Sequence, residues 1–167
     1  QVFQSGEVMD ARRHDYWVVS HLRDFQQRPG ENPLVVVQPR TTEDVQKILA
    51  IASETGTPIT PFGLGSGVCG GVVANAETIM LDMSAMKRLI EIDEVNLLAT
   101  FEAGYNGLEA EDAVQAKGLT IGHFPSSRNP KNKGPDRFVP VIAVAIAVRL
   151  RYCFPLYSKP LSRTLTS

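Results

Sequence analysis

The chain has 167 residues, 43% of them hydrophobic and 21% charged, which is sufficient for one packed globular domain. Its 17 basic and 18 acidic residues leave a net charge of −1, so it lacks the basic surface by which proteins hold nucleic acids. Its two cysteines have no metal-ligand spacing and exclude a disulfide framework, and its longest apolar run has about half of the ~20 residues that a membrane helix requires.

No signal-peptide pattern opens the chain, and so few cysteines are typical of a reducing compartment. We therefore expect a cytoplasmic protein without a transmembrane segment. The first residue is Gln1 rather than methionine, which indicates a fragment or a processed chain. Composition gives no indication of an oligomeric state.

Residues 1–32 are mostly polar and end in a turn-rich run. We interpret them as a weakly helical lead-in that lies outside the main sheet. We expect Tyr16 and Trp17 to pack this lead-in against the sheet rather than to stack on a ligand ring. His14 and His21 are expected to be ordinary side chains of the segment.

The next segment predicts a strand, a helix and a second strand. Leu34 to Val37 is a short apolar run, typical of a strand buried on both faces. Thr41 and Asp44 have the spacing of a capping box, and the helix that they begin has apolar residues at helical spacing and ends at Gly56. Pro58 to Pro61 then predicts a short strand that enters a glycine-rich loop.

After this loop, extended runs are predicted at 78–83, 89–92, 97–101 and 119–121. Between the last two, Asn106 and Glu109 offer a second helix start, and Gly118 ends that helix. Strands and helices mixed in this way indicate an α+β domain with an α/β-type subdomain.

The glycine-rich loop, Pro61 to Gly71, is the most informative segment. Five of its eleven residues are glycines, a density that core packing does not explain. Glycines let backbone N–H groups converge into a concave nest for an anion, and a pyrophosphate suits such a nest. Ser66 can add a hydroxyl donor.

Two alternatives remain open for this loop. Gly65, Gly67 and Gly70 satisfy G-x-G-x-x-G, the fingerprint of nicotinamide dinucleotides. No helical periodicity follows them, however, and Asp82 comes too soon to be the expected acidic residue. The second alternative is a structural glycine turn that binds no ligand.

Several segments in one continuous order resemble the PCMH-type FAD-binding domain of the vanillyl-alcohol oxidase superfamily, namely 39–45, 58–71, 81–84 and 102–104. The run Gly118 to Ser127, with Gly104 to Gly107 and Glu111 before it, is most similar to the alkyldihydroxyacetonephosphate synthase branch. The glycolate oxidase and D-lactate dehydrogenase branch is the near relative. The likeness covers about residues 16–127. It implies two α/β subdomains that hold an extended FAD between them, of which this chain has the N-terminal one, and a separate cap domain for the substrate.

The resemblance also implies how the cofactor is held. The loop wraps the FAD pyrophosphate through its backbone amides, and a second FAD-contacting segment begins at two serines. The cofactor-binding residues implied in this way are Pro61, Phe62, Gly63, Leu64, Gly65, Ser66, Gly67, Val68, Ser126 and Ser127. No histidine lies in the loop, so the implied FAD is bound non-covalently, and its flavin carries the redox chemistry.

We therefore divide the chain into an N-terminal lead-in at 1–32, a partial PCMH-type FAD-binding domain at 33–127 and an atypical tail at 128–167. Nothing in the tail resembles the family, and its composition indicates a frameshifted or misassembled reading frame. A divergent but real ending is the alternative. On either interpretation the cap and the catalytic residues are missing, so we expect the chain to be too incomplete for activity by itself.

The leading hypothesis is FAD binding, as part of a flavin-dependent oxidoreductase or transferase resembling alkyldihydroxyacetonephosphate synthase. That branch implies that the flavin activates an acyl-dihydroxyacetone phosphate, so that a fatty alcohol replaces the acyl chain. One alternative is an FAD-linked 2-hydroxy-acid oxidase or dehydrogenase acting on glycolate or D-lactate. Another is a non-catalytic truncated product that binds nucleotide weakly or aggregates. The full-length family enzyme takes a small-molecule substrate.

Four single residues, Cys69, Asp82, Glu102 and His123, could have either a structural or a functional role. Cys69, inside the loop, is expected to be a small buried residue without a partner. Asp82 and Glu102 are interpreted as structural anchors, because neither has an obvious second carboxylate beside it. His123 is either a structural hydrogen-bonding residue or a contact to the flavin or to a substrate phosphate.

Overall fold

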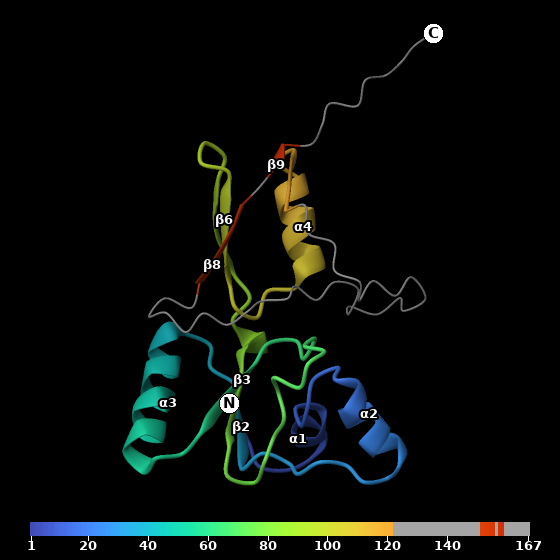
Figure 1. The fold of residues 1–167 in the computed structure, drawn as a ribbon. Helices are drawn as coiled ribbons and strands as arrows, with labels where there is room; N and C mark the ends of the chain where they lie inside the picture. The colour runs from blue at the N-terminus through green and yellow to red at the C-terminus, as the bar shows by residue number, and fades with distance from the viewer. Residues whose placement is uncertain (122–150, 156, 159–167) are drawn as a thin grey trace.

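Four strands form the main sheet of the computed structural model, which describes residues 1–121, 151–155 and 157–158 (Figure 1). The strands lie in the order β1 (Val2–Phe3), β2 (Val35–Val37), β4 (Ile79–Asp82) and β3 (Ile59–Phe62). β2, β4 and β3 are parallel, whereas β1 pairs antiparallel with β2. The prediction that 1–32 lies outside the main sheet is therefore wrong. Val2 and Phe3 pair with the backbone of Val37 and Val36, which would otherwise be the unpaired edge of β2.

Helices cover both faces of this sheet (Figure 1). α3 (Thr42–Thr55) lies on one side, and α1 (Glu7–Ala11) and α2 (Val18–Phe25) lie on the other. Side chains alternate between the faces of a strand, so neighbouring residues of β4 enter different cores. Met80 packs with Met9 of α1, and Leu81 packs with Val45 of α3. The lead-in thus forms the helical layer on the face of the sheet opposite α3.

The predicted boundaries of α3 are confirmed in atomic detail. Thr41 Oγ1 accepts a hydrogen bond from the Asp44 backbone N–H at 3.2 Å, and the Asp44 carboxylate accepts one from the Thr41 N–H at 3.3 Å. This reciprocal capping box satisfies two N–H groups that the first helical turn leaves free. Gly56 ends the helix in the left-handed region, with φ at 67°.

A second unit follows the sheet. The 3₁₀ turn η1 (Met83–Ala85) leads to the antiparallel hairpin β5 (Leu89–Asp93) and β6 (Leu98–Glu102), and then to α4 (Gly107–Gln115) and β7 (Leu119–Thr120). β8 (Arg151–Pro155) extends the hairpin antiparallel to β6, and β9 (Tyr157–Ser158) pairs with β7. The mixed α+β class and the predicted strands and helices in this part of the chain are confirmed.

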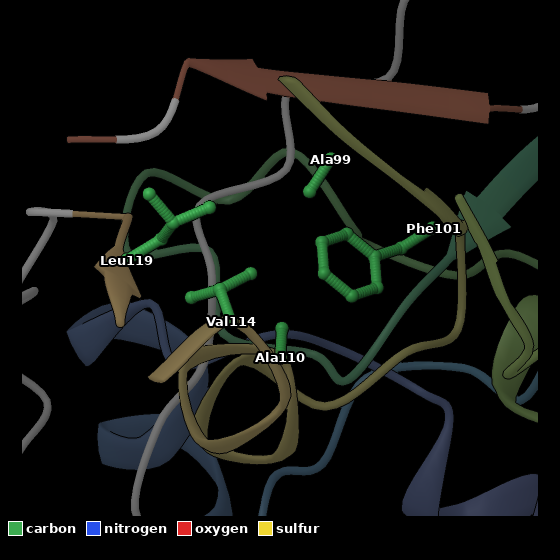
Figure 2. Packing of buried hydrophobic residues seen from close by; sticks show 5 residues of the cluster. All are labelled: Ala99, Phe101, Ala110, Val114 and Leu119. Atoms are coloured by element: carbon green, nitrogen blue, oxygen red, sulfur yellow. The ribbon is translucent and has the colours of Figure 1, made fainter. Parts of the chain in front are cut away.

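A small apolar cluster joins α4 to the hairpin. Figure 2 shows residues of β6 and β7 facing α4, and the cluster consists of Ala99, Phe101, Ala110, Val114 and Leu119. All five are buried, and the alanines let helix and strand approach closely around the one aromatic ring. Asn106 caps α4, because its side-chain oxygen accepts from the Leu108 N–H at 2.8 Å. None of the described helices combines the length and the apolar character needed to cross a membrane.

Candidate functional site

The glycine-rich loop leaves the main sheet at the carboxyl end of β3. That strand ends at Phe62, and the chain re-enters the same sheet at Ile79. In open α/β sheets ligands bind outside the carboxyl ends of the parallel strands, which is where this loop begins. No helix begins between Phe62 and Ile79. The nicotinamide alternative therefore lacks the helix N-terminus on which its fingerprint depends.

The backbone of the loop leaves its donors free. From Gly63 to Gly71, no backbone N–H donates a hydrogen bond to another residue of the described part of the chain. One carbonyl group of the loop does form a hydrogen bond, since Gly65 O accepts from the Tyr16 N–H at 3.1 Å. A continuous run of unpaired N–H groups is the donor set that an anionic ligand requires.

Three glycines of the loop are required by the loop's own packing. A Cβ atom on Gly65 would lie 2.7 Å from Phe62 Cζ, and one on Gly70 would lie 2.8 Å from Trp17 Cε3. Both glycines also have positive φ angles, of 70° and 74°. A Cβ on Gly67 would lie 2.5 Å from Asp15 Oδ2. Core packing was not expected to explain the glycines. That expectation is wrong for these three positions, because each glycine leaves the space that a packed side chain occupies.

The other two loop glycines are unlike them. A Cβ on Gly63 or Gly71 would meet no atom of the described residues within 4 Å, and neither residue has a positive φ. The fold of the loop therefore does not require glycine at these positions. At Gly63 the free space lies directly after β3, where a ligand can approach the backbone.

The predicted site residues do not share one environment. Phe62 and Gly65 are buried, Ser66 is partly buried and Val68 is 68% exposed. Cys69 is exposed, so the prediction of a small buried residue is wrong. The loop turns it outward, and no apolar neighbour covers it among the described residues. Three predicted positions lie outside the described residues, namely His123, Ser126 and Ser127.

Trp17 and Tyr16 of the lead-in meet the loop, the first through its ring and the second through its backbone. The Trp17 ring lies against Gly70, and Tyr16 has 60% of its surface exposed while its backbone bonds to Gly65. The lead-in packs on the sheet through other apolar side chains, among them Met9 and Phe3. The prediction for Tyr16 and Trp17 is therefore wrong about their target. The Trp17 ring meets the loop because residues 13–17 run beside it, whereas the Tyr16 ring lies against His21, with ring centroids 5.2 Å apart.

A partly buried ion pair lies at the carboxyl end of β4. Asp82 is fully buried, and its carboxylate accepts from Arg12 Nε at 3.1 Å and from the Ser84 N–H at 2.9 Å. The Arg12 guanidinium also lies over the Phe62 ring, 5.2 Å from its centroid. Asp82 is the structural anchor that was predicted. The role of Arg12 was not predicted, because an arginine in a polar segment gives no sequence signal for a partner 70 residues away.

Glu102 is the second predicted anchor, and it ties the hairpin to the chain before it. Its carboxylate accepts from the Arg88 backbone N–H at 2.8 Å and from Arg88 Nε at 2.8 Å. This pairing raises the pKa of Arg88 above its ordinary value. The neighbouring Gly104 donates its N–H to Met86 O at 2.8 Å, so the chain passes close to η1 here.

Glu111 holds the last described residues before the second predicted FAD segment. Its buried carboxylate accepts from Thr120 Oγ at 2.6 Å and from the Ile121 N–H at 2.9 Å. A carboxylate with both oxygens on hydrogen-bond donors fixes the exit of β7 relative to α4. The family resemblance named Glu111 without giving it a role, and this contact supplies one.

Acid is expected to loosen the lead-in through Asp24. His14 Nε2 lies 2.7 Å from the Asp24 carboxylate, and Arg13 Nη2 donates to it at 3.3 Å. The hydrogen bond with His14, together with the positive charges nearby, lowers the pKa of Asp24 from its ordinary value of 3.8. A lowered pKa means that the carboxylate stabilises the fold above the unfolded-state value, and that this stabilisation is lost as pH falls through the folded-state value.

We therefore expect wild type to be more stable than Asp24→Asn at neutral pH, with the difference shrinking as pH falls below 3.8. Urea unfolding of both proteins across this pH range measures the difference in unfolding free energy. A difference that grows on acidification would contradict the assigned direction.

Comparison with known proteins gives one family over most of this region. The family described as an FAD binding domain matches residues 33–132. The glycolate oxidase subunit GlcD of Bacillus subtilis is 40% identical over 95 residues, which are 57% of this chain and 20% of that protein. The alkyldihydroxyacetonephosphate synthase of Trypanosoma brucei brucei is 35% identical over 118 residues, which are 68% of this chain and 18% of that protein.

The fold has known counterparts as well. A solved structure of an alkyldihydroxyacetonephosphate synthase superimposes with a TM-score of 0.69 and 22% identity, over 75% of this chain and 24% of that one. At this identity the superposition shows a shared fold. The chain spans about a fifth of the length of the curated relatives described above.

Proposed function

The chain belongs to the FAD-binding domain family, and from this premise we propose that its glycine-rich loop binds the pyrophosphate of FAD through Pro61 to Val68. The predicted PCMH-type family and its cofactor, FAD, are confirmed, whereas the site residues are our proposal. One observation carries it: no backbone N–H from Gly63 to Gly71 has an acceptor among the described residues. Two negatively charged phosphates supply the acceptors that these donors lack.

The chain's own residues have distinct tasks in this proposal. The loop amides hold the phosphate charge, and Gly63 lets the ligand approach the backbone because nothing described lies within 4 Å of its missing Cβ. Ser66 adds a hydroxyl donor. When FAD is bound, its flavin supplies the redox chemistry. We propose non-covalent attachment, because Pro61 to Gly71 contains no histidine.

The proposal extends to the remaining predicted positions and boundaries. Residues 33–127 are proposed as the FAD-binding portion, with Ser126 and Ser127 as the start of a second contacting segment. The described contacts of Glu111 support the second part, because its carboxylate fixes Ile121, close to that segment. For the tail at 128–167 we propose an altered reading frame on the ground of its composition, although the family match extends to residue 132.

For the whole protein we propose an enzyme resembling alkyldihydroxyacetonephosphate synthase, acting on a small-molecule substrate. The observations that favour it are the fold likeness, with a TM-score of 0.69, and a relative that matches 68% of this chain. The second candidate is a glycolate or D-lactate oxidase or dehydrogenase. The 40% identity to a glycolate oxidase subunit favours that candidate.

An FAD titration of the purified chain tests the proposed site. We expect saturable binding, followed by flavin fluorescence, and competition by ADP, which carries the pyrophosphate and adenosine half of the cofactor. FMN has a single phosphate and no pyrophosphate, so it should bind more weakly than FAD. Equal binding of FMN and FAD, or no effect of ADP, would show that the loop does not recognise a pyrophosphate.

A further inference from the structure

The lead-in crosses the glycine-rich loop and is bonded to both of its ends. Near the beginning of the loop, Gly65 O accepts from the Tyr16 N–H at 3.1 Å. Beyond its end, Val72 O accepts from the Asp15 N–H at 3.1 Å, and the Ala74 N–H donates to Arg13 O at 2.9 Å. His14 also forms an isolated antiparallel bridge with Val73. Residues 13–17 therefore span the two ends of a loop that lies about 50 residues further along the chain.

The side chain of Asp15 lies at the centre of this crossing. It is 2% exposed, and its two oxygens accept from different backbone segments. Oδ1 accepts from the Trp17 N–H at 3.1 Å, and Oδ2 accepts from the Val72 N–H at 3.4 Å. Gly67, in the middle of the loop, passes so close that a Cβ there would be 2.5 Å from Oδ2. The Asp15 carboxylate thus lies against Gly67 in the middle of the loop and is bonded to Val72 just beyond its end.

This contact matters because hydrogen bonds from the loop's own amides do not hold its backbone in place. The amides from Gly63 to Gly71 make no hydrogen bonds to other described residues, so no ladder or turn holds their directions. A binding loop that is ordered before the ligand arrives loses less conformational freedom on binding. We propose that Asp15 is a positioning residue, whose carboxylate holds the loop so that its free N–H groups form a ready cradle for the FAD pyrophosphate. This inference rests on the proposed function of the loop.

Because Asp15 is charged, the direction in which a substitution changes ligand affinity tests the inference. A carboxylate beside an anion site repels the phosphates, so removing only its charge should strengthen binding. Removing the support should weaken binding. Asp15→Asn does both, because an amide side chain has one acceptor oxygen and cannot accept from both the Trp17 and the Val72 N–H groups. The direction of the change in affinity therefore shows which effect dominates.

The chain has a built-in reporter for the loop. Trp17 is the only tryptophan, and its ring lies against Gly70, so its fluorescence follows the contact between lead-in and loop without any ligand. ADP serves as the ligand probe, because it carries the pyrophosphate and does not absorb at the tryptophan emission wavelength. Asp112→Asn is the matched control, since it removes one negative charge from an exposed position on α4.

We expect Asp15→Asn, made in the full 167-residue chain, to shift Trp17 emission to the red and to increase its quenching by acrylamide. The dissociation constant for ADP should rise about tenfold, the effect of losing one hydrogen bond to a charged group. Asp112→Asn should change neither quantity. Unchanged Trp17 emission with equal or tighter ADP binding in Asp15→Asn would overturn the inference. If wild type binds neither ADP nor FAD, the proposed function fails, and the Trp17 signal alone decides whether Asp15 holds the loop.

Gly67→Ala disturbs the same contact from the side of the loop and leaves Asp15 in place, so it also serves if Asp15→Asn fails to fold. Gly67→Ala places a methyl group against the carboxylate and should lower the melting temperature. In an Asp15→Ala background the same change should cost much less, because the oxygen that it meets is gone. Equal effects of Gly67→Ala in both backgrounds would show that Asp15 and the loop are not coupled.

Discussion

Replacing Gly65 with alanine is expected to weaken FAD binding about 100-fold while leaving most of the fold in place. Gly65 has a φ of 70°, a left-handed conformation that costs other residues roughly 1–2 kcal/mol. A methyl group there would also lie 2.7 Å from Phe62 Cζ, and overpacking of this kind typically costs about 1–3 kcal/mol. Together these costs are about 3 kcal/mol, and each 1.4 kcal/mol is a factor of about ten in a binding constant.

The loss should appear in binding rather than in global stability, because the loop can leave its native conformation without unfolding the sheet. The population of the binding-competent loop then falls, and the apparent affinity falls with it. An FAD titration of Gly65→Ala beside wild type measures the effect. Gly71→Ala is the control in the same loop, since it has no positive φ and no described atom within 4 Å of the added Cβ. Equal affinities of Gly65→Ala and Gly71→Ala would contradict the packing argument.

Gly104→Ala is expected to destabilise the whole fold by about 3 kcal/mol, the upper range for overpacking. An added Cβ would overlap the backbone carbonyl oxygen of Met83 and would lie 2.9 Å from Ser84 Cα. Both obstacles are backbone atoms, which cannot rotate away as a side chain can. The Gly104 N–H also donates to Met86 O at 2.8 Å, so moving the chain apart breaks that bond. Domain stabilities of about 5–15 kcal/mol make such a loss severe.

Urea unfolding followed by circular dichroism measures this loss of stability. The matched control is Gly30→Ala, which meets no described atom within 4 Å and has no positive φ. Its unfolding midpoint should stay close to that of wild type. If Gly104→Ala and Gly30→Ala had equal unfolding midpoints, the backbone of η1 would be shown to move away from the methyl group without loss of stability.

Much of the secondary structure could be predicted because its causes lie within a few neighbouring residues. Thr41 and Asp44 are three positions apart and cap each other across that distance. Gly56 ends α3 in a left-handed conformation that glycine adopts at little cost, whereas α4 ends at Gln115 and the left-handed Gly118 closes the turn that follows it. The alternative of a dinucleotide helix after Gly70 could be disfavoured for the same reason, because its periodicity is a local property.

The order of the sheet could not be predicted, because it depends on pairings between distant segments. β4 lies between β2 and β3, although it follows both in the chain. The lead-in contributes an edge strand, and nothing in Val2 and Phe3 distinguishes them from a loop. Strands this short carry too few side chains to show an alternating pattern.

The sequence by itself determined the family, the cofactor, the limits of α3 and the loop that carries the proposed pyrophosphate site. It did so because glycine density, capping pairs and motif order are properties of contiguous residues. Only the tertiary structure decided why particular glycines are needed and what supports them. Gly65, Gly67 and Gly70 each face a side chain, and the Asp15 carboxylate reaches Val72 across 57 positions. Such contacts arise from chain folding in space, so no local pattern records them.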